Sequence, residues 1–105
     1  MQSVYIGTEL KLNINIEPID GKTMNDYNFE VEVFCNPHKS TTIKKGDNYC
    51  IPVDSTNYII LVDTSKVGIG NLKCKVTAFI PDTHFDDFFR TEVVLLNTDI
   101  QIVKI

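Results

Sequence analysis

Apolar and polar residues alternate strictly along Leu10–Glu17, where leucine or isoleucine occupies every second position. A period of two places successive side chains on opposite faces, which predicts a β-strand with one buried and one solvated face. The alternation recurs along the chain, and no stretch shows the spacing of an amphipathic helix. The sequence therefore predicts an all-β fold.

Further strands are predicted where β-branched and aromatic residues gather between turn signals. After a first strand at residues 9–17, they cover 29–35, 40–44, 49–53, 58–62, 71–80 and 88–97, and 100–105 either continues the last strand or adds one. Proline in the 49–53 strand predicts a sheet edge, because proline cannot donate to the ladder. One helical turn is expected after Asp63 or Thr64. About seven or eight short strands with regular turns favour an antiparallel β-sandwich.

Length, charge and composition narrow the class of protein. A chain of 105 residues is expected to form one domain, residues 1–105. The net charge of −4 disfavours nucleic acid as a partner, because phosphate backbones repel an acidic protein. No apolar run is long enough to cross a membrane, and Met1–Tyr5 lacks the features of a signal peptide. We therefore expect synthesis in a cytoplasm and no membrane partner.

Candidate chemical groups are few, and each has a simpler explanation. Cys35 lies near His38, but it ends an apolar strand face, which favours a buried structural thiol over a nucleophile. Residues 82–87 contain three aspartates and a histidine without the spacing of a calcium loop, which favours a solvated acidic loop. The odd number of cysteines argues against a disulfide framework. We expect no enzymatic activity, no cofactor and no metal.

Two patterns carry family resemblances. Gly70, Leu72 and Cys74 alternate as in the penultimate strand of immunoglobulin-like domains, although the chain has no Trp and Leu72 stands at the tyrosine-corner position. The resemblance implies an immunoglobulin-like sandwich in which Cys35 and Cys74 take the positions of the inter-sheet pair. Inside a cell both thiols should stay reduced, and outside they could oxidise.

The second pattern, in residues 63–70, 73–82 and 88–94, resembles small virion proteins of tailed bacteriophages that infect Bacteroides-type gut bacteria, crAss-like phages among them. The resemblance implies a structural β-sandwich protein of the virion, such as an auxiliary protein on the capsid surface. The implied partners are the major capsid protein or other virion proteins, with many copies on a lattice. A tail or fibre adaptor is the alternative role within a virion.

The last third of the chain holds more large apolar residues than one core can enclose. Some are expected to pack beneath loops, and the remainder to form a protein-contact surface. The residues predicted to make this contact are Phe79, Phe85, Phe88 and Phe89, with Arg90 as a polar anchor. A carbohydrate-binding or adhesive sandwich is a second hypothesis. It is disfavoured because Trp is absent and the tyrosines are scattered.

Overall fold

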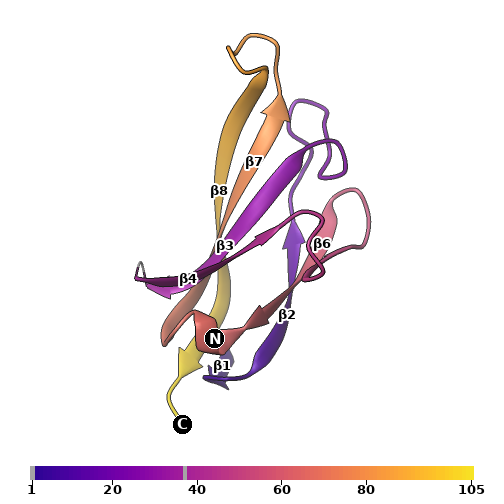
Figure 1. Cartoon of the computed structure of the whole chain (residues 1–105). Helices are drawn as coiled ribbons and strands as arrows, with labels where there is room; N and C mark the ends of the chain where they lie inside the picture. The colour runs from indigo at the N-terminus through magenta and orange to yellow at the C-terminus, as the bar shows by residue number, and fades with distance from the viewer. Residues whose placement is uncertain (1, 37) are drawn as a thin grey trace.

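Eight strands and one 3₁₀ turn make up the secondary structure in the computed structural model, which describes residues 2–36 and 38–105 (Figure 1). The elements are β1 (Gln2–Tyr5), β2 (Glu9–Asn15), β3 (Asn28–Asn36), β4 (Lys39–Lys44), β5 (Cys50–Pro52), β6 (Asn57–Asp63), η1 (Thr64–Lys66), β7 (Gly70–Pro81) and β8 (Phe89–Val103). The molecule is elongated, measuring 50 × 27 × 24 Å.

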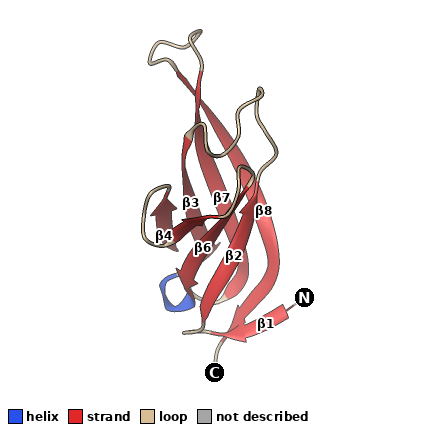
Figure 2. Ribbon diagram, turned by 90° about the vertical axis from the view of Figure 1, so that its right-hand side faces the viewer, coloured by secondary structure: helices blue, strands red, loops and turns tan. Residues whose placement is uncertain are grey.

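The strands form two sheets that face each other, so the chain is an all-β sandwich (Figure 2). The five-stranded sheet has the order β1-β8-β7-β3-β4, and the three-stranded sheet has the order β2-β6-β5. Apart from β1, which runs parallel to β8, every pairing is antiparallel. The orders β8-β7-β3-β4 and β2-β6-β5 correspond to strands GFCC′ and BED of variable-type immunoglobulin domains, which confirms the immunoglobulin-like sandwich.

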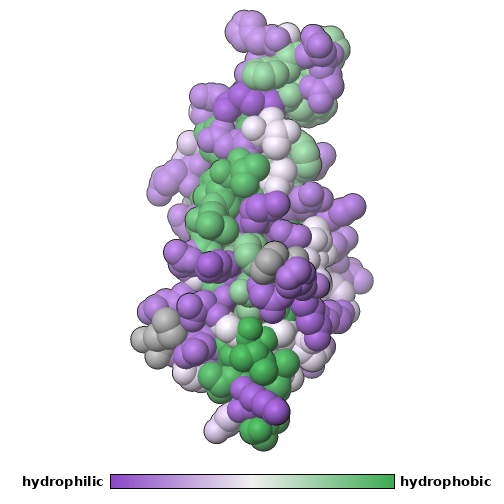
Figure 3. Space-filling model, turned by 90° about the vertical axis from the view of Figure 1, so that its left-hand side faces the viewer, coloured by the Kyte–Doolittle hydropathy of each residue, from purple (hydrophilic) through white to green (hydrophobic). Residues whose placement is uncertain are grey.

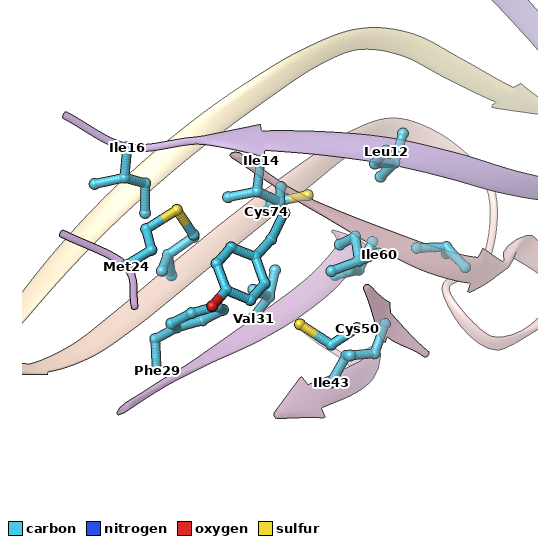
Figure 4. Close-up of a cluster of buried hydrophobic side chains, with 14 of the residues drawn as sticks. Leu12, Ile14, Ile16, Met24, Phe29, Val31, Ile43, Cys50, Ile60 and Cys74 are labelled. Carbon is cyan, nitrogen blue, oxygen red and sulfur yellow. The ribbon is translucent and has the colours of Figure 1, made fainter. Parts of the chain in front are cut away.

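Alternating apolar residues fill the space between the sheets. Leu12 and Ile14 point inward from β2, and the inward residues of β7, from Leu72 to Ile80, are at most 1% exposed (Figure 4). The polar residues of β2 remain in solvent, as its alternation predicts. The ring of Phe29 meets that of Tyr58 edge-on at 5.1 Å, a favourable aromatic geometry that joins the two sheets.

Polar contacts close both ends of the core. At one end, the Lys45 ammonium donates to the carbonyl oxygens of Met24, Asn25 and Tyr27 at 2.8–3.2 Å, which fixes the loop that buries Met24. At the other end, the buried Thr64 hydroxyl donates to the Thr8 carbonyl at 2.7 Å and accepts from the Gly7 amide at 2.9 Å. This second contact holds the turn by which the chain passes from β1 to β2.

The five-stranded sheet contains one strand that the sequence did not predict, and it shows how the C-terminal segment relates to the last predicted strand. Strand β1 was not predicted, because Gln2–Tyr5 is short and pairs with a partner at the far end of the chain. The C-terminal segment continues β8 through an irregularity opposite Leu72, where Asp99 has a φ of 59°. The Thr98 hydroxyl bridges this irregularity by donating to the Leu72 carbonyl at 2.8 Å.

The prediction that Cys35 and Cys74 take the positions of the inter-sheet cysteine pair is wrong. Cys35 lies on β3 and Cys74 on β7, and these strands are neighbours in the same sheet, where Cys74 is opposite Val33. Cys35 instead lies beside Gly70, where an added Cβ would be 3.5 Å from the Cys35 Cβ. The error arose because Cys35 was assigned to the second strand of the fold. That position belongs to β2, which carries Leu12 and Ile14. All three cysteines are free thiols.

The buried Cys74 thiol makes the stability of the protein depend on alkaline pH. Burial raises the pKa of this thiol from 9.0 to about 11. Below pH 9 both folded and unfolded chains hold the proton. Between pH 9 and 11 the unfolded chain loses it first, so folding stability falls, by up to about 2–3 kcal/mol from this group.

Urea unfolding of the wild type and of Cys74→Val at about pH 8 and about pH 11 tests this. The difference in unfolding free energy between the two pH values should be smaller in the variant, because valine does not ionise. An equal loss of stability in both proteins would contradict the prediction.

Candidate protein-contact site

The β7–β8 hairpin extends beyond the rest of the sandwich. Strand β3 pairs with β7 only as far as Phe79, because β3 begins at Asn28, which lies opposite Phe79. Strands β7 and β8 continue to the Pro81–Phe89 pair, and the loop 82–88 follows (Figure 1). The hairpin therefore presents a projecting end, which we call the tip loop.

Internal hydrogen bonds fix the conformation of the tip loop. The Asp82 amide donates to the Phe88 carbonyl at 2.8 Å, and the Phe88 amide donates to the Phe85 carbonyl at 2.9 Å. The Asp82 carboxylate accepts from the His84 amide at 2.9 Å, and the Asp87 carboxylate accepts from the Phe89 amide at 3.1 Å. The loop is thus a closed turn with a defined backbone conformation.

Three phenylalanines are exposed at or beside this loop. Phe85, Phe88 and Phe89 are 47%, 64% and 47% exposed. Phe88 also adopts a φ of 65°, in the left-handed region that costs a bulky side chain about 1–2 kcal/mol relative to glycine. A strained backbone that carries an exposed aromatic ring is typical of a binding surface, where strain and exposure serve an interaction outside the fold.

The other two predicted contact residues lie lower on the hairpin. Phe79 is half-buried on the outer face of the sheet, opposite Thr91. Arg90 points to the other face, where it pairs with the carboxylates of Asp20, Asp82 and Glu92. Its hydrogen bond to Glu92, at 2.6 Å, is the largest of the effects that raise the pKa of the guanidinium.

Arg90 therefore acts within the molecule. Its guanidinium joins the base of the hairpin, through Asp82 and Glu92, to the β2–β3 loop, through Asp20. The four aromatic residues and Arg90 all lie on the β7–β8 hairpin. Of these five, Phe85, Phe88 and Phe89 are the ones that are free to contact a partner.

Sequence reasoning missed two exposed apolar residues on β8. Val93 and Leu95 are 57% and 59% exposed and lie on the same face as Phe89. With the neighbouring Phe79 they form an apolar surface that we call the outer stripe, and Figure 3 shows hydrophobic side chains gathered in the upper half of this face. The run of four apolar residues at 93–96 was the available signal, since one face of such a strand must stay outside the core.

The remaining candidates give no assembled chemical site. Burial raises the pKa of the Cys35 thiol, which lowers its nucleophilicity at neutral pH. Within residues 2–36 and 38–105, no three His, Cys, Asp or Glu side chains are grouped as metal ligands. An open groove of about 500 Å³ is lined by residues of β2, β4 and β6, with Ile43 and Leu61 among its apolar residues and both acidic and basic residues in its lining.

The exposed aromatic residues outside the hairpin are dispersed. Tyr49, which is 59% exposed, borders the open groove, and Tyr5, which is 60% exposed, lies on β1. Tyr27 and Tyr58 are buried in the core. Of the tyrosines, only Tyr49 is therefore both exposed and placed beside a groove.

Comparisons with protein-family models, with curated proteins and with solved structures find no match to this chain. The described residues include no helix of the length and apolar character needed to span a membrane. The geometry of the hairpin is therefore the main guide to function.

The Arg90 ion pairs should restrain the tip loop more than they stabilise the whole fold. Replacing Arg90 with Met removes the charge and leaves an unbranched, apolar side chain in its place. We expect amide hydrogen exchange in residues 82–89 to become roughly two- to fivefold faster, with little change in the core strands, because partly exposed ion pairs have small local effects.

Hydrogen exchange measured by mass spectrometry checks this prediction, with Arg90→Lys as the matched variant that keeps the charge. The lysine variant should lie between the wild type and Arg90→Met, since it loses the planar guanidinium. Exchange in the tip loop that is unchanged in Arg90→Met would show that the ion pairs do not restrain the hairpin.

Proposed function

We propose that this chain is a non-enzymatic structural protein of a tailed-phage virion, an auxiliary protein that binds the capsid through its tip loop. The observation that carries the proposal is the projecting hairpin end, with Phe88 exposed on a strained backbone and Phe85 and Phe89 exposed beside it. Exposed aromatic residues on a rigid support are typical centres of protein–protein binding energy, because they bury large areas at low entropic cost.

The chemistry of the tip loop defines the kind of surface it fits. Phe85 and Phe88 require an apolar depression on the partner. Asp86, Asp87 and the net charge of −4 favour basic residues around that depression. A partner with an apolar pocket and a basic rim is therefore the best complement.

The assignment to a virion rests on the resemblance carried by residues 63–70, 73–82 and 88–94 and is compatible with the properties of the fold. A small rigid sandwich with a projecting contact needs no moving parts or reactive groups to act as a structural component. Repeated copies of a capsid protein offer many equivalent sites, so an auxiliary protein can cover the lattice through one modest contact per copy. If each copy also touches its neighbours, the effective concentration at each site rises.

Binding to purified capsid shells, measured by co-sedimentation, tests the proposal with Phe88→Gly. Glycine removes the aromatic ring and relieves the left-handed backbone, so the unfolding free energy should stay within about 1 kcal/mol of the wild type. Binding should nevertheless weaken at least about tenfold, because a central aromatic contact is lost. This separation of stability from binding distinguishes a contact residue from a structural one.

Tyr49→Ser is the matched control, because Tyr49 is a similarly exposed aromatic residue far from the hairpin on the β5 side. It should bind shells like the wild type. Wild-type protein that fails to bind shells or capsid protein would refute the capsid assignment, and binding to tail or fibre proteins would then favour the adaptor role. Glycan-array signals that depend on Tyr49 would instead support a carbohydrate-binding sandwich.

A further inference from the structure

The free sheet edges of the molecule differ in how well they are protected. Strand β5 has only three residues and contains Pro52, and β4 begins and ends with lysine. Short length, proline and lysine are the usual features that prevent an edge from pairing with another chain. Strand β2 exposes charged and amide side chains along its solvent face. These three edges are poor templates for an added strand.

The edge of β8 is different. Within the described residues, β1 pairs with this edge only along Ile100–Val103. The preceding segment Thr91–Asn97 has β7 on one side and no strand on the other. It carries a single charge, Glu92, and contains no lysine, proline or glycine. Such a long unprotected edge leaves backbone groups available for pairing with another strand.

We propose that β8 pairs antiparallel with β8 of a second copy of this chain, on a twofold axis at Val94, to form one continuous sheet. In this register Val93 lies opposite Leu95 of the other copy, and Thr91 lies opposite Asn97. On the outer face, apolar residues of the outer stripe thus meet apolar residues and polar residues meet polar ones, whereas on the inner face Glu92 lies opposite Leu96 of the other copy. Directly opposed side chains in an antiparallel pair are in contact, so this match stabilises the dimer.

Twofold registers with the axis at Glu92 or at Val93 match less well. An axis at Glu92 would place two carboxylates directly opposite each other, which is destabilising. An axis at Val93 would place Leu95 opposite Thr91 and would bring the two Glu92 side chains to diagonal positions. With the axis at Val94, Glu92 lies opposite Leu96 of the other copy, and the two Glu92 carboxylates are four residues apart along the pair, so they do not repel each other directly.

The length of the free edge also fits a second copy. Strand β1 begins opposite Ile100, so an incoming strand must end before that residue. The Thr91–Asn97 segment of a second copy covers only Thr91–Asn97 and leaves β1 in place. The same segment is then both the template and the added strand, as a closed twofold interface requires.

Paired charge variants test both the dimer and its register. Val93→Lys and Leu95→Glu are each exposed changes on the outer stripe, and circular dichroism checks that both fold. Sedimentation equilibrium of the wild type should give a concentration-dependent dimer. Each single variant should raise the dimer dissociation constant at least about tenfold, because a charge then faces an apolar residue. The double variant should recover to within about threefold of the wild type, because two Lys–Glu pairs then lie opposite each other.

Val53→Lys is the matched control, since Val53 is 55% exposed and follows β5 in the other sheet. It should dimerise like the wild type. A wild-type protein that stays monomeric at its solubility limit would overturn the proposal. Equal weakening by Val53→Lys would place the interface elsewhere, and failure of the double variant to recover would overturn the register. Open fibres in place of a closed dimer would refute twofold pairing.

Discussion

The buried face of β7 is the constraint on which the rest of the structure depends. Leu72, Cys74, Val76, Ala78 and Ile80 are at most 1% exposed, and β7 pairs with β3 on one side and β8 on the other. The three-stranded sheet covers this face, but it is narrower than the five-stranded sheet. The inward residues Val94 and Leu96 of β8 are therefore only partly buried, although they pack against the core. The hairpin projects because β3 begins only opposite Phe79, and the β8 edge is free because β1 pairs with it only along Ile100–Val103.

The tip loop and the free edge of β8 offer different kinds of contact to a partner. At the tip loop, short-range hydrogen bonds and the Arg90 ion pairs hold aromatic side chains away from the fold, so the contact is made by side chains. Along Thr91–Asn97, the backbone is also available, because β7 occupies only one side of the strand. A tip contact tolerates any partner with a suitable pocket, whereas an edge contact requires an extended strand. One chain can therefore make both contacts at once.

The sequence predicted most strands because their period-two alternation is a local property. Leu10–Glu17 and Asn71–Ile80 needed no knowledge of their neighbours, and the surplus of phenylalanines at 85–89 identified the tip loop. Long-range relations were not accessible. Arg90 meets Asp20 from 70 residues away, and β1 is a strand only because it pairs with the end of β8. The misplaced Cys35 has the same origin, since strand order within a sheet is set by tertiary pairing. Val93 and Leu95 were missed because a continuous apolar run does not show which face is solvated.

The two proposals constrain each other through the direction of the strands. In an antiparallel pair of β8 strands the two hairpins run in opposite directions, so the tip loops of a dimer point away from each other. Such a dimer cannot place both tips on one flat surface. On a capsid shell, it would bind with one tip and present the other outward, where the second tip could reach a further virion component. Pairing through β8 would then turn a protein with one binding surface into a connector with two identical, opposed ones, without any additional contact residues.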